Sequence, residues 1–260
     1  MLIEILLLIS VGAAAGLVAG LLGVGGGTII VPALIFLFEF SNTNTDLMVQ
    51  MSVATSMACI VITSISSTYA HHQKKGVMWD LVKSIGIGIP LGAIFGVLLV
   101  NLISGFILKI LIVIFMIYIG INMLSTKINA TKNIMLKNTN HFFPGSIIGF
   151  LSIPLGIGGG TFTVPYLKSL GYDIRKAIGT SAACGIMIAV TATIFFSLPI
   201  ELASLQLNEN LIYWPGVFWI SFSSIIFSRL GARLTYLIKE DFLRRIFGIF
   251  VFIVAIFLVI

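Results

Sequence analysis

A glycine-rich phrase occurs twice in this chain, and each copy interrupts an apolar segment. It reads Gly-Val-Gly-Gly-Gly-Thr-Ile-Ile-Val-Pro at residues 23–32 and Gly-Ile-Gly-Gly-Gly-Thr-Phe-Thr-Val-Pro at residues 156–165. Hydrophobic residues make up 58% of the 260 positions and charged residues only 9%, and several apolar stretches are long enough to cross a bilayer. Unwound backbone at membrane depth survives only where it is buried in protein or lines a cavity. Paired interruptions of this kind therefore predict a binding site between two halves of a membrane protein.

Composition excludes several other classes. The net charge of +6 is spread singly and in pairs through short loops, so no basic domain for nucleic acid is expected. The first segment, 2–22, carries Glu4 and no Lys or Arg, whereas a secretory signal starts with positive charge, so it is expected to remain as structure. Cys59 and Cys184 lie inside apolar spans, which argues against a disulfide framework.

The chain divides into two similar halves. The glycine runs are offset by 133 residues, and a second match aligns Ala-Thr-Ser-Met-Ala-Cys at 54–59 with Gly-Thr-Ser-Ala-Ala-Cys at 179–184. We predict a first transmembrane repeat at 1–124, a cytoplasmic linker at 125–141 and a second repeat at 142–260. Each repeat is expected to hold an apolar segment ending in glycines, a short broken or re-entrant segment and three longer spans. The predicted segments are 2–24, 28–38, 47–69, 78–100 and 105–124, then 143–157, 161–170, 174–197, 212–236 and 242–260.

Positive charge predicts the orientation of the halves. Lys and Arg gather in four connections, which the positive-inside rule places in the cytoplasm. Loop 71–76 is then inside, whereas its counterpart 198–211, with Glu201 and Glu209, is outside. Equivalent loops on opposite faces predict inverted repeats. The expected fold is thus an all-α membrane protein of two inverted repeats in the cell membrane, with both termini outside.

The glycine runs match neither a P-loop nor a dinucleotide fingerprint, because both lack the residues that follow the glycines in those motifs. Close helix packing through small residues is the plain alternative. A broken helix explains more: glycine adopts the required dihedrals, a Thr can cap the new helix, and Pro32 and Pro165 suit its first turn. Helix N-termini also attract anions. The candidate substrate-binding residues of the two runs are Gly25, Gly26, Gly27, Thr28, Gly158, Gly159, Gly160 and Thr161.

The second matched motif adds hydroxyls and thiols. Thr and Ser can donate hydrogen bonds to an anion, although they also occur as small residues at helix crossings and often bond their own helix. The cysteines lie one turn further on and suit either packing or contact with a sulfur-containing ligand. These further candidates for substrate binding are Thr55, Ser56, Cys59, Thr180, Ser181 and Cys184.

No catalytic or metal site is expected. His71 and His72 lie beside Lys74 and Lys75 in what we predict to be a cytoplasmic loop, and no cluster of acidic residues or cysteines is near them. With no histidine predicted within a span, a nucleophile–base pair is missing. No carboxylate occupies the centre of a span, so a proton relay has no evident carrier. No cofactor is predicted.

The doubled Gly-x-Gly-Gly-Gly-Thr-x-x-Val-Pro and the Thr-Ser-x-Ala segment in each half resemble the TauE/SafE family of membrane permeases, also described as sulfite exporters. The resemblance spans essentially the whole chain. It implies transport of sulfur-containing anions such as sulfite, thiosulfate or organosulfonates, often outward.

We therefore expect a transporter of a small anion embedded in the lipid bilayer, not an enzyme. An anion channel, an importer of another small organic anion, and a non-transporting subunit of a sulfur-metabolism complex remain alternatives. The sequence leaves open the anion, the direction, the coupling ion and the oligomeric state, including a homodimer.

Overall fold

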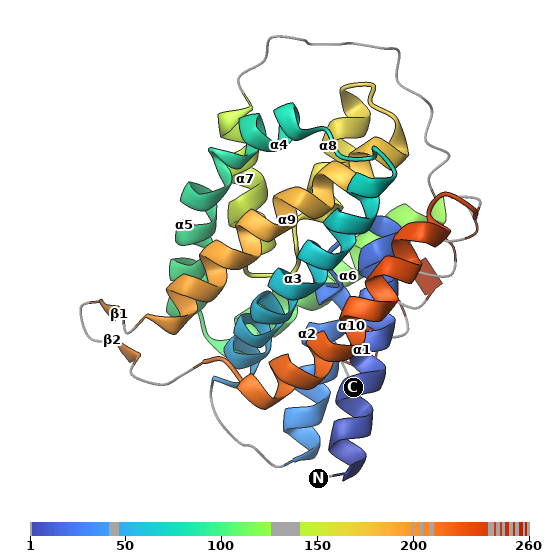
Figure 1. The fold of residues 1–260 in the computed structure, drawn as a ribbon. Helices are drawn as coiled ribbons and strands as arrows, with labels where there is room; N and C mark the ends of the chain where they lie inside the picture. The colour runs from blue at the N-terminus through green and yellow to red at the C-terminus, as the bar shows by residue number, and fades with distance from the viewer. Residues whose placement is uncertain are drawn as a thin grey trace.

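The computed structural model describes residues 2–41, 47–125, 141–198, 200–202, 205–207 and 211–238, with single positions beyond. Apolar helices dominate this part of the chain (Figure 1). The helices are α1 (Leu2–Leu22), α2 (Gly27–Phe40), α3 (Met48–Gln73), α4 (Trp79–Gly86), α5 (Ile89–Leu102), α6 (Gly105–Ser125), α7 (Phe142–Ser152), α8 (Gly160–Ser169), α9 (Ile174–Ser197) and α10 (Trp214–Leu234).

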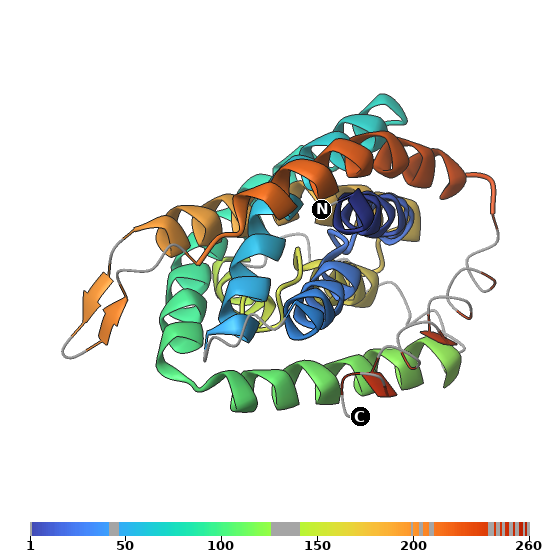
Figure 2. The same cartoon turned by 90° about the horizontal axis from the view of Figure 1, so that it is seen from below.

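Two helices from equivalent places in the halves, α3 and α9, lie side by side through the middle of the molecule. Helix α1 packs along α10, and α7 packs along α5, so each pairing joins one half of the chain to the other. Seen from below, α6 runs along one edge of the bundle (Figure 2). The short helices α2 and α8 pack against α3 and α9, respectively.

Glycines allow the close helix pairs. A Cβ on Gly12 would strike the Ile220 carbonyl, and one on Gly16 would lie 2.7 Å from the Ser224 carbonyl oxygen. On α7, a Cβ on Gly145 would strike the Ile85 carbonyl of α4, and one on Gly149 would strike the Ile89 carbonyl of α5. Gly12 and Gly145 share the offset of 133 seen for the glycine runs. Small residues that let backbones approach drive helix association in membranes.

Among the described residues, four helices are long and apolar enough to cross a membrane by themselves: α1, α3, α9 and α10. The predicted span 78–100 is instead two helices, α4 and α5, bent by 49°. The break lies at Ile87 and Gly88, and Pro90 occupies the first turn of α5. Proline supplies no N–H and disrupts the preceding turn, which explains the bend. If this bent pair counts as one span, the described residues hold five, and the chain is a multi-pass membrane protein.

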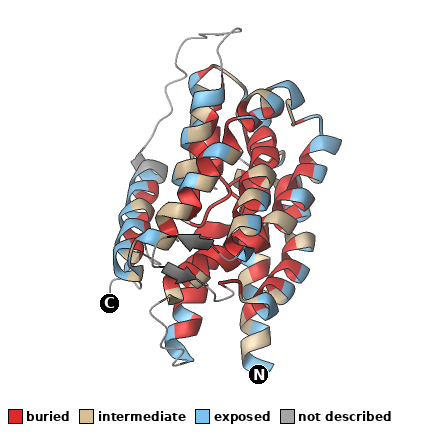
Figure 3. Cartoon of the chain, turned by 90° about the vertical axis from the view of Figure 1, so that its left-hand side faces the viewer, coloured by how far each residue is buried: buried red, intermediate tan, exposed pale blue. Residues whose placement is uncertain are grey.

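Buried residues fill the middle of the bundle and exposed ones cover its outer faces (Figure 3). The exposed side chains are largely apolar; on α6 they include Phe106, 75% exposed, and Ile114, 59% exposed. A helix that is apolar on its outer face suits contact with lipid.

The all-α prediction holds for nearly all described residues, with one exception. Strands β1 (Ile200–Leu202) and β2 (Leu205–Leu207) form an antiparallel hairpin within the loop that follows α9. The predicted linker lies largely outside the described residues, as does most of the predicted last span, 242–260.

Candidate functional site

Both glycine runs are breaks in the helical backbone, as predicted. Gly23 and Gly26 have φ of 68° and 80°, and the matching Gly156 and Gly159 have φ of 64° and 77°. Residues with a side chain rarely adopt these values, whereas glycine does so freely. Gly26 and Gly159 are the N-caps of α2 and α8, so each run ends one helix and begins the next.

The two breaks touch each other, and we call this contact the glycine crossing, residues 23–28 and 156–161. The amide of Gly158 donates to the Val24 carbonyl at 3.1 Å. A Cβ on Gly25 would lie 2.9 Å from the Gly158 Cα. Only glycine allows this close approach of two backbones.

Further contacts at the crossing occur in reciprocal pairs. A Cβ on Gly27 would strike the carbonyl of Gly156, and a Cβ on Gly160 would strike the carbonyl of Gly23. Each run is thus packed against the first glycine of the other.

Serines of the second motif hold the runs in place. The Ser56 hydroxyl donates to the Gly156 carbonyl at 2.9 Å, and the Ser181 hydroxyl donates to the Gly23 carbonyl at 2.9 Å. Both serines are fully buried. A hydroxyl has one proton, so neither serine can donate to an anion while it keeps this bond. Their predicted contact with substrate stays a prediction that requires the bond to break.

Threonines of the same motif each hold the start of a helix in the other half. The Thr55 hydroxyl accepts the Tyr213 amide at 2.9 Å, and the Thr180 hydroxyl accepts the Met78 amide at 3.0 Å. Tyr213 and Met78 directly precede α10 and α4. A buried amide needs such a partner, which accounts for a Thr at this place in both halves.

The prediction that Thr28 and Thr161 cap the new helices is wrong. The caps are glycines in the left-handed conformation and make no side-chain cap bond, so both threonines fall inside the first turn. Their Oγ1 atoms are buried without a hydrogen-bond partner in the described part of the chain. Such a group costs roughly 1–3 kcal/mol, which marks it as a place for a water or a ligand.

Pro32 and Pro165 also lie deeper than predicted, as the sixth residue of α2 and of α8. A proline there cannot donate to the carbonyl four residues earlier. The carbonyls of Thr28 and Thr161 consequently lack the helical N–H that would bond them. The first turns of α2 and α8 therefore have unpaired carbonyls as well as unpaired amides.

The first turns supply donors to the crossing. Among the described residues, the amides of Gly27, Thr28, Gly160 and Thr161 donate to no backbone carbonyl. Free amides and the positive end of a helix dipole favour an anion. The surrounding segments carry no Asp, Glu, Lys or Arg; they are 5–38, 47–70, 142–167 and 177–198. A low dielectric strengthens the field of the two helix ends.

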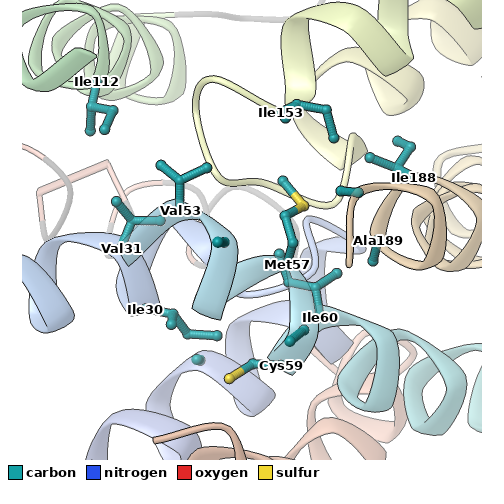
Figure 4. Packing of buried hydrophobic residues seen from close by; sticks show 14 of the residues in the cluster. Ile30, Val31, Val53, Met57, Cys59, Ile60, Ile112, Ile153, Ile188 and Ala189 are labelled. Carbon is teal, nitrogen blue, oxygen red and sulfur yellow. The ribbon is translucent and has the colours of Figure 1, made fainter. Parts of the chain in front are cut away.

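Both cysteines are buried and free of disulfides. Figure 4 shows Cys59 on the other side of α3 from Met57, which extends toward Ile153 and Ile188. Ser221 of α10 lies close to the Cys59 thiol. Contact of Cys59 and Cys184 with a ligand stays a prediction.

The expectation that His71 lies in a loop, and that no histidine lies within a span, is wrong. His71 belongs to α3 and is fully buried. Its Nε2 lies 2.9 Å from the Gly20 carbonyl oxygen. The neighbouring lysines suggested a loop, but α3 continues to Gln73, and its last turn contacts Gly20 of α1 and Tyr236 through His71.

A group of buried hydroxyls was not among the predicted site residues. Thr63, Ser64, Ser66, Ser67 and Thr68 of α3 are buried, as are four serines of α10. The signal was present as a run of hydroxyl residues at 63–68. In an apolar span such a run indicates either backbone bonding or a polar route.

Comparison of the chain with known proteins supports its assignment as a membrane transporter. Residues 8–258 match the model of the family described as "Sulfite exporter TauE/SafE". A "Probable membrane transporter protein" of Haemophilus influenzae is 34% identical over 255 residues, 97% of each chain. Another of Methanocaldococcus jannaschii is 30% identical over 240 residues, 92% of this chain and 89% of its own. No solved structure matches significantly. With the family model covering almost the whole sequence, the chain belongs to the sulfite exporter TauE/SafE family.

Proposed function

We propose that this protein carries a small sulfur-containing anion, such as sulfite, thiosulfate or an organosulfonate, across the cell membrane and out of the cell, without acting as an enzyme. The supporting observation is the glycine crossing, where the starts of α2 and α8 meet in surroundings free of charged side chains. The family description supports the sulfur chemistry.

In this proposal the anion is bound by the first turns of α2 and α8. The free amides of Gly27 and Gly160 and the hydroxyls of Thr28 and Thr161 donate to its oxygens. Ser56 and Ser181 position the two runs. No lysine or arginine is needed, because two helix N-termini together supply about one positive charge. Weak dipolar binding also lets the anion leave again, as transport requires.

We further propose that the halves are inverted repeats with both termini outside. The reciprocal bonds of Ser56 and Ser181, and those of Thr55 and Thr180, are the contacts that a two-fold relation between the halves produces. The charge of the loops supports the orientation. An inside-negative potential then favours export by about 2.3 kcal/mol per charge and 100 mV.

Flux into and out of proteoliposomes at an imposed potential tests the proposal. We expect saturable flux of sulfite or thiosulfate that increases when the potential drives the anion outward. Chloride and acetate serve as controls for other anions. Flux that does not saturate indicates a channel, and the absence of flux for every sulfur-containing anion contradicts the proposed substrate.

A further inference from the structure

A row of unsatisfied hydroxyls leads away from the crossing. In the described part of the chain, five buried hydroxyls beyond the crossing have no hydrogen-bond partner: Ser64, Ser67 and Thr68 of α3, Thr163 of α8 and Ser221 of α10. Each of these residues is at most 5% exposed. They are therefore cut off from bulk water in this structure.

The row begins at the crossing. A Cβ built on Gly185 of α9 would lie 2.8 Å from the Gly158 carbonyl oxygen and 3.1 Å from the Ser64 hydroxyl, so Ser64 is close to the second glycine run. From there Ser67, Thr68 and then His71 follow at helical spacings of three and four. The hydroxyls thus follow α3 from the crossing to its C-terminal end.

Satisfied hydroxyls flank the row. Thr63 is bonded to Ser224 of α10 at 2.8 Å, and Ser66 donates to the Ile225 carbonyl at 2.9 Å. The seam between α3 and α10 is therefore polar for about one turn of α3.

His71 closes the far end. Because a carbonyl only accepts, its Nε2 donates to Gly20 at 2.9 Å, and its Nδ1 lies 3.3 Å from the Tyr236 hydroxyl. The guanidinium of Arg175 lies over the Tyr236 ring, 5.6 Å from its centre. The closure at His71 and Tyr236 is made by side chains, which can rotate without a change in the helices.

We propose that this row is a hydrated route by which the anion passes between the glycine crossing and the His71 end of α3, and that His71 and Tyr236 close it. The inference rests on the proposed function. A buried hydroxyl without a partner costs roughly 1–3 kcal/mol, and buried water normally satisfies such groups. Hydroxyls also donate to the oxygens of an oxyanion, so one lining serves both water and substrate.

Packing alone does not call for these hydroxyls. At the offset of 125, Ser64 corresponds to Ala189, Ser67 to Ala192 and His71 to Phe196. The three residues of α9 are buried as well. In the other half these three positions are therefore filled by apolar groups, whereas Thr68 corresponds to Thr193, whose hydroxyl donates to the Ala189 carbonyl of its own helix at 2.7 Å.

Thiol labelling tests the route with a matched pair of variants. Ser67→Cys and Ala192→Cys would each be treated, in membranes, with a negatively charged methanethiosulfonate reagent. Wild-type protein, which carries Cys59 and Cys184, provides the baseline for labelling of the native thiols. We expect Ser67→Cys to react at least tenfold faster than Ala192→Cys. Equal rates overturn the proposal.

A second pair, Ser64→Cys and Ala189→Cys, replaces the first if a variant fails to fold. Adding His71→Ala to the Ser67→Cys or Ser64→Cys variant is expected to speed labelling of the introduced thiol several-fold, because the change removes the contact with Tyr236 that closes the route. No acceleration overturns the role of His71.

The same labelling assay tests the hydrated route and the binding of a sulfonate independently. Methanesulfonate, which does not react with thiols, is expected to slow labelling of Ser67→Cys. Fast labelling that no anion slows supports a hydrated route and overturns the proposed binding of a sulfonate.

Discussion

The seam between α3 and α10 and its counterpart between α9 and α5 differ in chemistry. Close to the crossing, Ser56 and Ser181 make the same bond to a glycine carbonyl. About three turns further along α3 and α9 the halves diverge, because α3 carries Ser67 where α9 carries Ala192. The duplicated contacts hold the crossing, where both halves need the same geometry. The flanking seams are unequal, so the two routes to the crossing need not be alike.

The largest effect is expected from a side chain at the caps. Gly26→Val and Gly159→Val should each reduce transport at least a hundredfold, because valine is strained at these positive φ angles. A Cβ on Gly26 would also lie 2.7 Å from the Ala15 carbonyl oxygen. Flux and membrane insertion would be measured together, with Gly105→Val at the start of α6 as control. Normal flux in either inserted cap variant would break the equivalence of the halves.

Loss of a reciprocal serine bond should lower stability. Ser56→Ala and Ser181→Ala each leave a buried carbonyl unsatisfied, which costs about 1–3 kcal/mol. The two losses should agree to within about 1 kcal/mol, because the bonds they remove are equivalent. Unfolding of purified protein in detergent measures both. A large loss in one variant and none in the other would show that only one run depends on its serine.

Removing the hydroxyls of the first-turn threonines should weaken anion binding without lowering stability. Thr28→Val and Thr161→Val keep the shape but remove the unpartnered hydroxyl. If the hydroxyl donates to the anion, affinity should fall about 10-fold to 150-fold, since a bond to a charged group contributes about 1.5–3 kcal/mol. Stability without ligand should stay equal or rise. Lower stability with unchanged affinity would contradict a role in binding.

The smallest effect distinguishes Tyr213 from its counterpart Met78. Burial, and then the hydrogen bond to Glu4, raise the pKa of Tyr213 to about 12. A raised pKa stabilises the folded state below the ordinary value of about 10, and this stability is lost as pH rises toward 12. The melting temperature should therefore drop between pH 10 and 12, and less so in Tyr213→Phe. An identical drop in both proteins would assign it to other groups.

Much of the architecture follows from the sequence, because membrane helices are set by local apolarity and by glycine and proline. The predicted span 174–197 coincides with α9 (Ile174–Ser197), and both glycine breaks lie where their positive φ angles require glycine. The bend between α4 and α5 had a visible cause in Pro90, but its size depends on packing against α7.

The site was less predictable. Ser56 bonds a carbonyl 100 residues away, and no local pattern reports such a partner. The burial of His71 comes with contacts to Gly20 of α1 and to Tyr236, whereas its sequence neighbours are lysines. Side-chain partners in a fold of this kind come from tertiary contacts, which residue spacing does not record.

Thermal stabilisation of the purified protein by anions tests the central claim most directly. A ligand at a hundredfold over its dissociation constant stabilises the folded state by about 2.7 kcal/mol. We predict that sulfite, thiosulfate or methanesulfonate raises the melting temperature more than chloride or acetate. The shift should be lost in the Thr28→Val, Thr161→Val double variant. An equal shift in the double variant, or no shift with any sulfur-containing anion, would contradict binding at the glycine crossing.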